Sequence, residues 1–193
     1  MKWLSEVSTM GTVIFRYGAM GASKTANLIM MQYNYSERGK QAIILKPSIE
    51  NRDGTLTIKS RIGLEAKCIY AEDFIKNPQK CDMIIVDECQ FLTTQQVNDL
   101  VSIADRFDTD IAFFGLKTNF QSNLFEGSKR IIELADKIEE IPTICWCGKK
   151  ARFNARLCDG KMITNGDEYV LGGNETYTAL CRKHYFERNL GDK

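Results

Sequence analysis

Four short apolar segments constrain the fold of this chain most strongly. They are residues 12–17 (TVIFRY), 42–46 (AIILK), 83–86 (MIIV) and 111–115 (IAFFG). Runs that are apolar at nearly every position are typical of strands buried on both faces, because helices cover each side of a parallel sheet. The sequence therefore predicts an α/β fold, with a mostly parallel sheet and helices on both faces.

Three segments between and after these runs have helical patterns. Residues 25–38 predict a helix that Gly39 can end in the left-handed conformation. Residues 93–107 predict a second helix, which begins with a capping box made by Thr93 and Gln96. Residues 128–140 (SKRIIELADKIEE) are also helix-like. From about residue 143 the chain contains more Gly, Asn and Cys and only short strand-like pieces, so we expect residues 10–142 and 143–193 to form separate domains.

Composition excludes several classes of protein. The chain has 193 residues with a formal net charge of +1, whereas proteins that grip nucleic acid usually carry a basic excess. No apolar run reaches the roughly 18 residues that span a bilayer, and the first ten residues lack the apolar core of a signal peptide. Seven cysteines without a secretory signal indicate a reducing compartment. We therefore expect a cytoplasmic protein that binds neither nucleic acid nor membrane.

The segment 18–25 (GAMGASKT) nearly matches a phosphate-binding P-loop. The pattern G-x-x-x-x-G-K-[ST] is met except that Ser23 replaces the last glycine. Its position between a strand and a helix suits the motif, because backbone N–H groups and the helix N-terminus together hold phosphate oxygens. Lys24 would reach the β- and γ-phosphates, and Thr25 would bind Mg²⁺. The Cβ of Ser23 would crowd the phosphate or strain the backbone. The alternative interpretation of the whole segment is a Gly/Ala-rich turn that binds no ligand.

An acidic pair follows the apolar strand at residues 83–86. Asp87 is placed to hold Mg²⁺ beside bound phosphates, and Glu88 is free to act as a base. The ends of parallel strands meet at one edge of a sheet, where ligands bind. A solvated acidic turn would explain this segment alone, but not its combination with the P-loop-like segment. The two together predict a nucleotide site.

The cysteines near the C-terminus form a metal-ligand pattern. Cys145 and Cys147 precede Cys181 and His184, and His184 is the only histidine of the chain. Two close pairs of such ligands in a loop-rich stretch predict a tetrahedral structural zinc site. Cys158 is the rival ligand, and reduced thiols with a surface histidine are the alternative. The remaining cysteines are interpreted as packing or structural residues; these are Cys68, Cys81 and Cys89.

These motifs together resemble the thymidine kinases of the zinc-containing P-loop type. The resemblance runs from about Met10 to Phe186, so residues 1–9 are expected to be an N-terminal extension. It is carried by YGAMGASKT, DECQF, NYSERGK, SRIG, GLKTNFQSNLFEGS, ADKIEEIPTICWCGKKA and GGNETYTALCRKHY. It implies a RecA-like P-loop core with a small zinc-binding lobe that carries a lasso-like loop. The implied reaction transfers the γ-phosphate of ATP to the 5′-hydroxyl of thymidine, or of deoxyuridine, with Mg²⁺.

The resemblance also assigns roles to individual residues. Glu88 is the implied catalytic base. ATP is assigned to Gly18, Ala19, Met20, Gly21, Ala22, Ser23, Lys24, Thr25, Asp87, Glu88, Cys89 and Gln90. The nucleoside is assigned to Met20, Phe120, Glu168, Tyr169, Val170, Leu171, Gly172 and Tyr177. Zinc is assigned to Cys145, Cys147, Cys181 and His184, and magnesium to Thr25 and Asp87. Relatives are commonly tetramers, so a homo-oligomer is expected.

The chain departs from the family at three positions, and two other functions compete. Ser23 replaces a glycine, and Asn119 and Gln121 stand where bacterial relatives often have Asp and Arg. One rival is a RecA-like DNA-dependent ATPase, which would need a basic face or stacking aromatic side chains. The other is a nucleoside-binding relative whose catalysis Ser23 has impaired. The presence of Lys24, Asp87 and Glu88 favours an active kinase.

Overall fold

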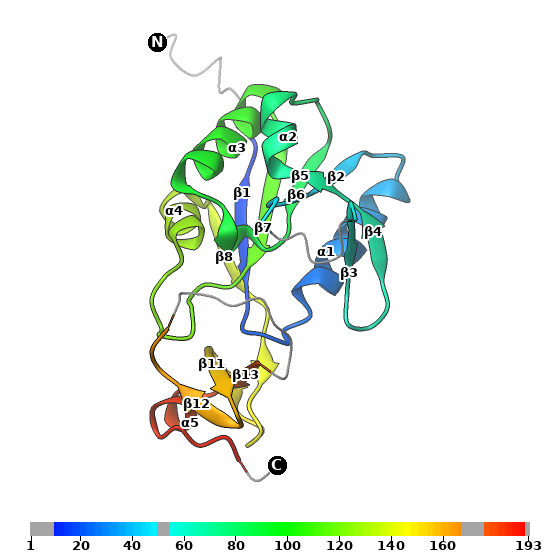
Figure 1. The fold of residues 1–193 in the computed structure, drawn as a ribbon. Helices are drawn as coiled ribbons and strands as arrows, with labels where there is room; N and C mark the ends of the chain where they lie inside the picture. Colours follow the sequence, from blue (N-terminus) through cyan, green and yellow to red (C-terminus); the bar gives the residue numbers. More distant parts are fainter. Residues whose placement is uncertain (1–9, 50–54, 167–175, 192–193) are drawn as a thin grey trace, which may run out of the picture.

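A six-stranded parallel sheet forms the larger part of the protein (Figure 1). This computed structural model describes residues 10–49, 55–166 and 176–191. The strand order is β5-β2-β6-β7-β1-β8. The bounds are β1 Val13–Tyr17, β2 Ala42–Lys46, β5 Ile69–Tyr70, β6 Met83–Val86, β7 Asp110–Gly115 and β8 Lys137–Glu140. The predicted α/β fold is confirmed, and each of the four apolar segments forms a central strand.

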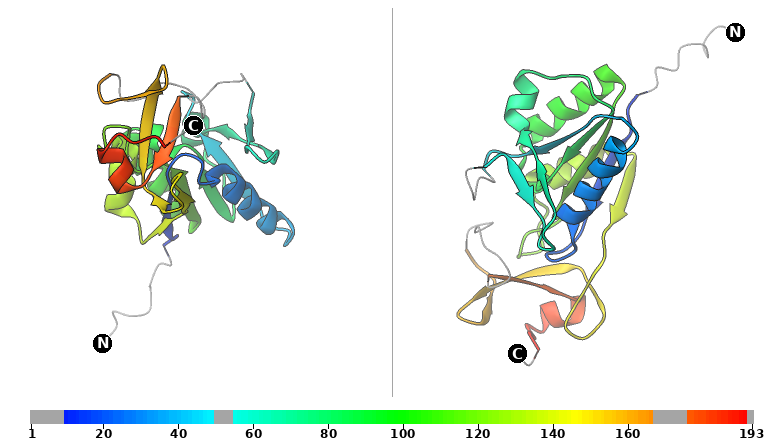
Figure 2. Two further views of the ribbon diagram at one scale, coloured as in Figure 1. Left: turned by 90° about the horizontal axis from the view of Figure 1, so that it is seen from below. Right: turned by 90° about the vertical axis from the view of Figure 1, so that its right-hand side faces the viewer.

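Helices cover both faces of the sheet (Figure 2), and the strands divide their side chains between two hydrophobic cores. The helices are α1 Lys24–Ser36, α2 Ala71–Lys76, α3 Thr94–Phe107 and α4 Glu126–Leu134. Ile111 and Phe113 of β7 join the core under α2, α3 and α4. Ala112 and Phe114 point the other way, into the core under α1 and the hairpin of β3 Thr57–Lys59 and β4 Glu65–Lys67. This alternation explains why the central strands are apolar throughout.

Local sequence signals set the ends of the first and third helices. At the start of α3, Thr93 Oγ1 accepts from the Gln96 N–H and Gln96 Oε1 accepts from the Thr93 N–H. The capping box is therefore confirmed. Helix α1 ends at Ser36, and Gly39 follows with a φ of 68°. The left-handed conformation expected of Gly39 is present.

The helix predicted over residues 128–140 is wrong in its second half. Helix α4 ends at Leu134, Ala135 is extended, and residues 137–140 form the edge strand β8 beside β1. Asp136 Oδ2 accepts a hydrogen bond from the Val13 N–H at 2.8 Å, which fixes the start of this pairing. The contact joins residues 123 positions apart, so a helical pattern read along the chain did not reveal it.

A small lobe lies below the carboxyl ends of the strands (Figure 1). It contains the hairpin β9 Thr143–Ile144 and β10 Lys150–Ala151, and the short helix α5 Arg182–Phe186. A three-stranded antiparallel sheet completes it, made of β11 Phe153–Cys158, β12 Lys161–Ile163 and β13 Tyr177–Leu180. Its core is small, with Ala155, Leu180 and Tyr185 among its buried residues. The lobe therefore needs stabilisation beyond apolar burial.

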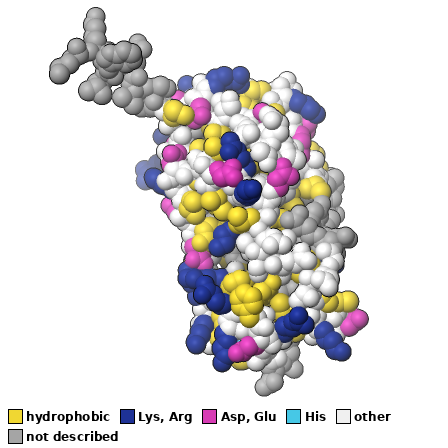
Figure 3. All heavy atoms as spheres, turned by 90° about the vertical axis from the view of Figure 1, so that its left-hand side faces the viewer, with side chains coloured by type: hydrophobic (Ala, Val, Ile, Leu, Met, Phe, Trp, Pro, Cys, Tyr) yellow, Lys and Arg dark blue, Asp and Glu magenta, His cyan; other side chains and the backbone are white. Residues whose placement is uncertain are grey.

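Two further observations concern the distribution of charge on one face of the protein and the apolar character of its helices. On the face shown in Figure 3, basic and acidic side chains are interspersed with apolar ones. Among the residues described, no helix combines the length and apolar character needed to cross a bilayer.

Candidate functional site

The P-loop-like segment connects β1 to α1 at the carboxyl edge of the sheet. Gly21 has a φ of 76°, and Ser23 adopts the left-handed conformation with φ 54° and ψ 32°. This conformation costs an ordinary residue about 1–2 kcal/mol, whereas glycine adopts it freely. Ser23 therefore occupies a backbone geometry suited to the glycine of the motif.

Lys24 is buried at the first position of α1. Its Nζ donates to the carbonyl oxygens of Gly18 and Ala19, each at 3.2 Å. Burial lowers the pKa of Lys24, while the nearby Glu88 and Asp87 oppose that shift. The Lys24 ammonium thus lies inside the loop, near the carboxylates of Asp87 and Glu88. At this position it could also donate to the oxygens of a bound phosphate.

Asp87 lies buried at the end of β6, opposite the first turn of α1. Its Oδ2 accepts from Thr25 Oγ1 at 3.1 Å, and its Oδ1 accepts from the Glu88 N–H at 3.0 Å. Burial and the neighbouring Glu88 raise the pKa of Asp87 to about 7. A carboxylate and a hydroxyl at this distance are hard oxygen ligands that suit Mg²⁺.

Glu88 begins the 3₁₀ turn η1, Cys89–Phe91. Its backbone is left-handed, with a φ of 49°, which is uncommon for a residue other than glycine, asparagine or aspartate. Such conformations cluster at functional sites, where the surrounding structure holds them in place. The Glu88 carboxylate is partly buried and accepts a hydrogen bond from Gln90.

One cleft of about 330 Å³ brings the two nucleotide segments together with the expected nucleoside residues. Its walls include Ser23, Lys24, Thr25, Asp87, Glu88 and Gln90, and also Met20, Phe120 and Tyr177. Gly18 and Ala19 line a smaller neighbouring cavity instead. Cys89 is fully buried in the core, as its structural interpretation requires. The segment 168–172, expected to contact the nucleoside, lies outside the described residues.

The small lobe holds the loop that carries Phe120. Phe120 is buried, its carbonyl oxygen accepts from the Tyr185 hydroxyl of α5, and the Arg156 guanidinium lies 5.3 Å from its ring centroid. Within this loop, Asn119 Oδ1 accepts from the N–H groups of Gln121 and Asn123, both at 3.0 Å. The Asn119 oxygen therefore shapes the loop as an aspartate oxygen would.

Asn154 is a site residue that sequence analysis missed. It is buried on β11, where its Oδ1 accepts from the Met20 N–H at 2.8 Å and its Nδ2 donates to the Thr118 carbonyl at 3.1 Å. It therefore joins the lobe both to the P-loop-like segment and to the loop that carries Phe120. The sequence contains only a weak indication of this role. Asparagine is depleted in strands, so an asparagine inside a strand-like segment indicates a specific polar contact.

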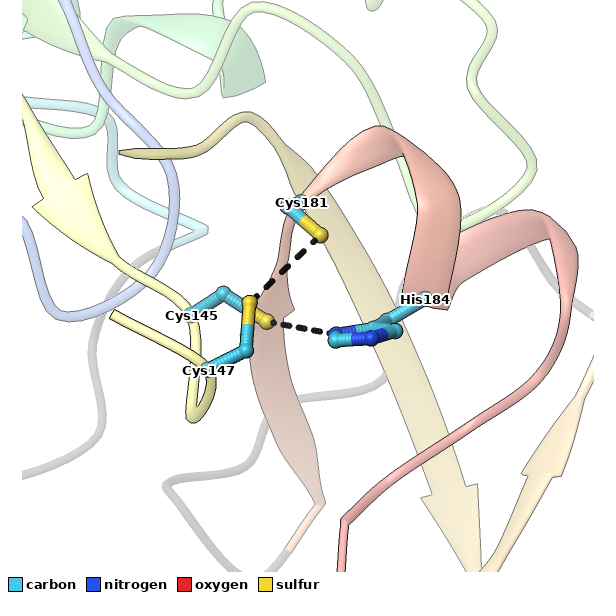
Figure 4. A group of neighbouring side chains, drawn as sticks. All are labelled: Cys145, Cys147, Cys181 and His184. Carbon is cyan, nitrogen blue, oxygen red and sulfur yellow. Dashed lines mark hydrogen bonds between the residues drawn. The ribbon is translucent and has the colours of Figure 1, made fainter. Parts of the chain in front are cut away.

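The four predicted metal ligands converge in the lobe (Figure 4). The ligand atoms of Cys145, Cys147, Cys181 and His184 lie within 4.8 Å of one another. Cys145 Sγ is 3.4 Å from His184 Nδ1, and Cys147 Sγ is 4.0 Å from Cys181 Sγ. Tetrahedral zinc, with its usual bond lengths, sets such pairs about 3.6 and 3.8 Å apart. The geometry therefore fits zinc.

The electrostatics and surroundings of this cluster also suit a metal. Burial raises the pKa of Cys145, but hydrogen bonds from the backbone of Cys147 and Cys181 and from His184 outweigh it, so the value falls to about 6. Trp146 stacks on His184, with ring centroids 4.2 Å apart, and fixes the imidazole plane. Cys158 is exposed at the end of β11 and is not part of the cluster. Cys68 and Cys81 are buried, as expected of packing residues.

We expect about one zinc ion for each chain when the protein is purified without chelators. Cys145→Ser should lower the zinc content and the melting temperature, because the metal joins the β9–β10 hairpin to α5 in a lobe with a small core. Elemental analysis and thermal unfolding measure both effects. Cys158→Ser is the matched control and should retain the metal. Zinc loss in the control, or none in Cys145→Ser, would contradict the assignment.

Comparison with known proteins identifies the family. The family model for thymidine kinase matches residues 11–185. The thymidine kinase of Streptococcus agalactiae serotype Ia is 42% identical over 189 residues, covering 94% of this chain and 100% of the relative. Those of Streptococcus gordonii and Lactococcus lactis are 41% and 40% identical, covering 95% and 94% of this chain and 100% of each relative. The chain therefore belongs to the thymidine kinase family, a family of ATP-dependent phosphotransferases.

Proposed function

We propose that this protein transfers the γ-phosphate of ATP to the 5′-hydroxyl of thymidine, with deoxyuridine as a second acceptor. The observation that carries the proposal is the single cleft that joins the phosphate loop, the acidic pair and Phe120. A phosphoryl donor and a nucleoside acceptor bound in one cleft can meet in line, and positioning accounts for most of the catalysis of such reactions.

The donor side of the cleft is proposed to bind the phosphates of ATP. The loop 18–25 would surround them with backbone N–H groups, and Lys24 would exchange its contacts with Gly18 and Ala19 for phosphate oxygens. Thr25 and Asp87 would hold Mg²⁺ through Thr25 Oγ1 and Asp87 Oδ2, which are already 3.1 Å apart. When bound, the ion neutralises charge that develops on the phosphates.

Glu88 is proposed to remove the proton of the acceptor hydroxyl. It lies next to Asp87 and lines the same cleft as the P-loop-like segment and Phe120. A base must come within hydrogen-bond reach of the proton that it takes. A carboxylate in the cleft shared by the proposed donor and acceptor sites would meet that requirement, and Phe120 and Tyr177 would hold the nucleoside beside it.

The lobe is proposed to close the acceptor side and exclude water. Asn154 and Tyr185 already contact Met20 and Phe120 from the lobe. Removing water strengthens the interactions in the cleft and suppresses hydrolysis of ATP. In this proposal, residues 10–142 bind the nucleotide, and residues 143–193 form the zinc-held domain that completes the site. A homo-tetramer in the cytoplasm is also proposed, on the resemblance to the family.

An assay of ADP release tests the proposed function. The rate is measured with thymidine, with single-stranded DNA and with neither acceptor present. Stimulation by thymidine supports the kinase, whereas stimulation by DNA indicates an ATPase motor. ATP and thymidine binding without ADP release would indicate an impaired relative.

We expect Glu88→Gln to lower kcat by about 10²- to 10⁴-fold, because the general base is lost while the size and shape of the side chain are kept. The dissociation constant for ATP should change little, since Lys24 and the loop remain. Steady-state kinetics and nucleotide titration measure the two quantities. Glu133→Gln, which removes an exposed carboxylate paired with Arg130, should keep the native kcat. A Glu88→Gln variant with nearly native kcat would exclude Glu88 as the base.

We expect Ser23→Gly to lower the KM for ATP by about tenfold and to leave the KM for thymidine unchanged. Ser23 lines the cleft beside Lys24, and one crowded or misaligned hydrogen bond to a phosphate costs about 1–3 kcal/mol. Ser122 is also left-handed, with a φ of 68°, so Ser122→Gly is the control and should keep the KM for ATP. An unchanged KM for ATP in Ser23→Gly would show that the serine fits without cost.

A further inference from the structure

Gln90 lies beside the Glu88 carboxylate at the wall of the cleft, with only 3% of its surface exposed. It is the middle residue of η1, and both ends of its amide are engaged. Its Nε2 donates to Glu88 Oε2 at 2.6 Å, and its Oε1 accepts from the Leu116 N–H at 2.9 Å. The amide thus connects the acidic turn to the chain just beyond β7.

The backbone fixes which way this amide faces. The Leu116 N–H can only donate, so the group opposite it must be the amide oxygen. The amide nitrogen then has to face Glu88, where it donates to one carboxylate oxygen. The other oxygen of Glu88 stays available to an acceptor hydroxyl in the cleft.

Two glycines give the turn and its amide the space that they need. A Cβ on Gly115 would lie 2.4 Å from Gln90 Oε1 and 2.6 Å from Cys89 Sγ. A Cβ on Gly127 of α4 would lie 2.6 Å from the carbonyl oxygens of Cys89 and Leu92. Such distances are too short for any side chain, so β7 and α4 enclose η1 closely. Gln90 is therefore held on a rigid support.

We propose that Gln90 is a positioning residue that orients the Glu88 carboxylate for proton transfer, rather than a contact to ATP. The proposal rests on the proposed role of Glu88 as the base. A glutamate side chain has three rotatable bonds, and fixing one of its oxygens removes most of that freedom. Because a shift of about 1 Å at a reacting group costs roughly 100-fold in rate, the tether matters for kcat.

Gln90→Met tests the proposal, because methionine is similar in size but makes neither hydrogen bond. We expect kcat to fall about 10- to 100-fold, while the KM values for ATP and thymidine stay within about twofold of native. Gln90→Glu keeps an acceptor for the Leu116 N–H but turns an oxygen toward Glu88. It should also lower kcat, and it replaces Gln90→Met if that variant does not fold.

A control separates lost orientation from lost stability. Thr109 is buried just before β7, at the other end of the strand from Leu116, and its Oγ1 donates to the Cys81 carbonyl at 2.8 Å. Thr109→Val removes this buried hydrogen bond without altering the cleft. It should lower the melting temperature and keep the native kcat.

The double variant Glu88→Gln/Gln90→Met tests whether Gln90 acts through Glu88, separately from the test of Glu88 as the base. If Gln90 acts through Glu88, the double variant should be no slower than Glu88→Gln alone. Additive losses, a raised KM for ATP with native kcat, or native kinetics in Gln90→Met would each overturn the positioning role. If Glu88→Gln itself keeps native kcat, the base assignment fails, and the positioning role fails with it.

Discussion

The backbone at Gly115 joins the two halves of the proposed nucleotide site. Strand β7 lies between β1 and β6, so its carboxyl end separates the phosphate loop from the acidic turn. The Gly115 carbonyl accepts from the Gly18 N–H at 3.2 Å, and its missing side chain leaves room for Cys89 and Gln90. The next residue, Leu116, holds the Gln90 amide. The spacing of the strands and this one glycine therefore set the distance between Lys24 and Glu88.

The acceptor side depends on the lobe, which in turn depends on the Cys/His cluster. Few apolar residues are buried in the lobe, but the cluster connects the β9–β10 hairpin to α5. Tyr185 of α5 reaches the Phe120 carbonyl, and Asn154 of β11 reaches Met20. A structural metal in such a lobe would therefore act on the proposed nucleoside site through hydrogen bonds, without contacting a substrate.

Much of the fold and part of the site were predictable because their signals are local. The four apolar strands, the capping box of Thr93 and Gln96, and the left-handed Gly39 each depend on neighbours along the chain. The convergence of the cysteines with His184 was predicted from two short spacings. By contrast, residues 137–140 have a helical pattern but form β8, because pairing with β1 outweighs local preference.

By itself, the sequence determined the fold class and the family, and it predicted which residues carry the chemistry, because hydrophobic periodicity and motif spacing are properties of short segments. Only the tertiary structure decided how these residues are held. Asn154 meets Met20 across 134 positions, and Gln90 meets Leu116 across 26. A hydrogen bond between distant residues depends on where the packed elements place a donor and an acceptor. No pattern along the chain records that placement, so the supports of the Met20 loop and of the Glu88 carboxylate became visible only in the folded protein.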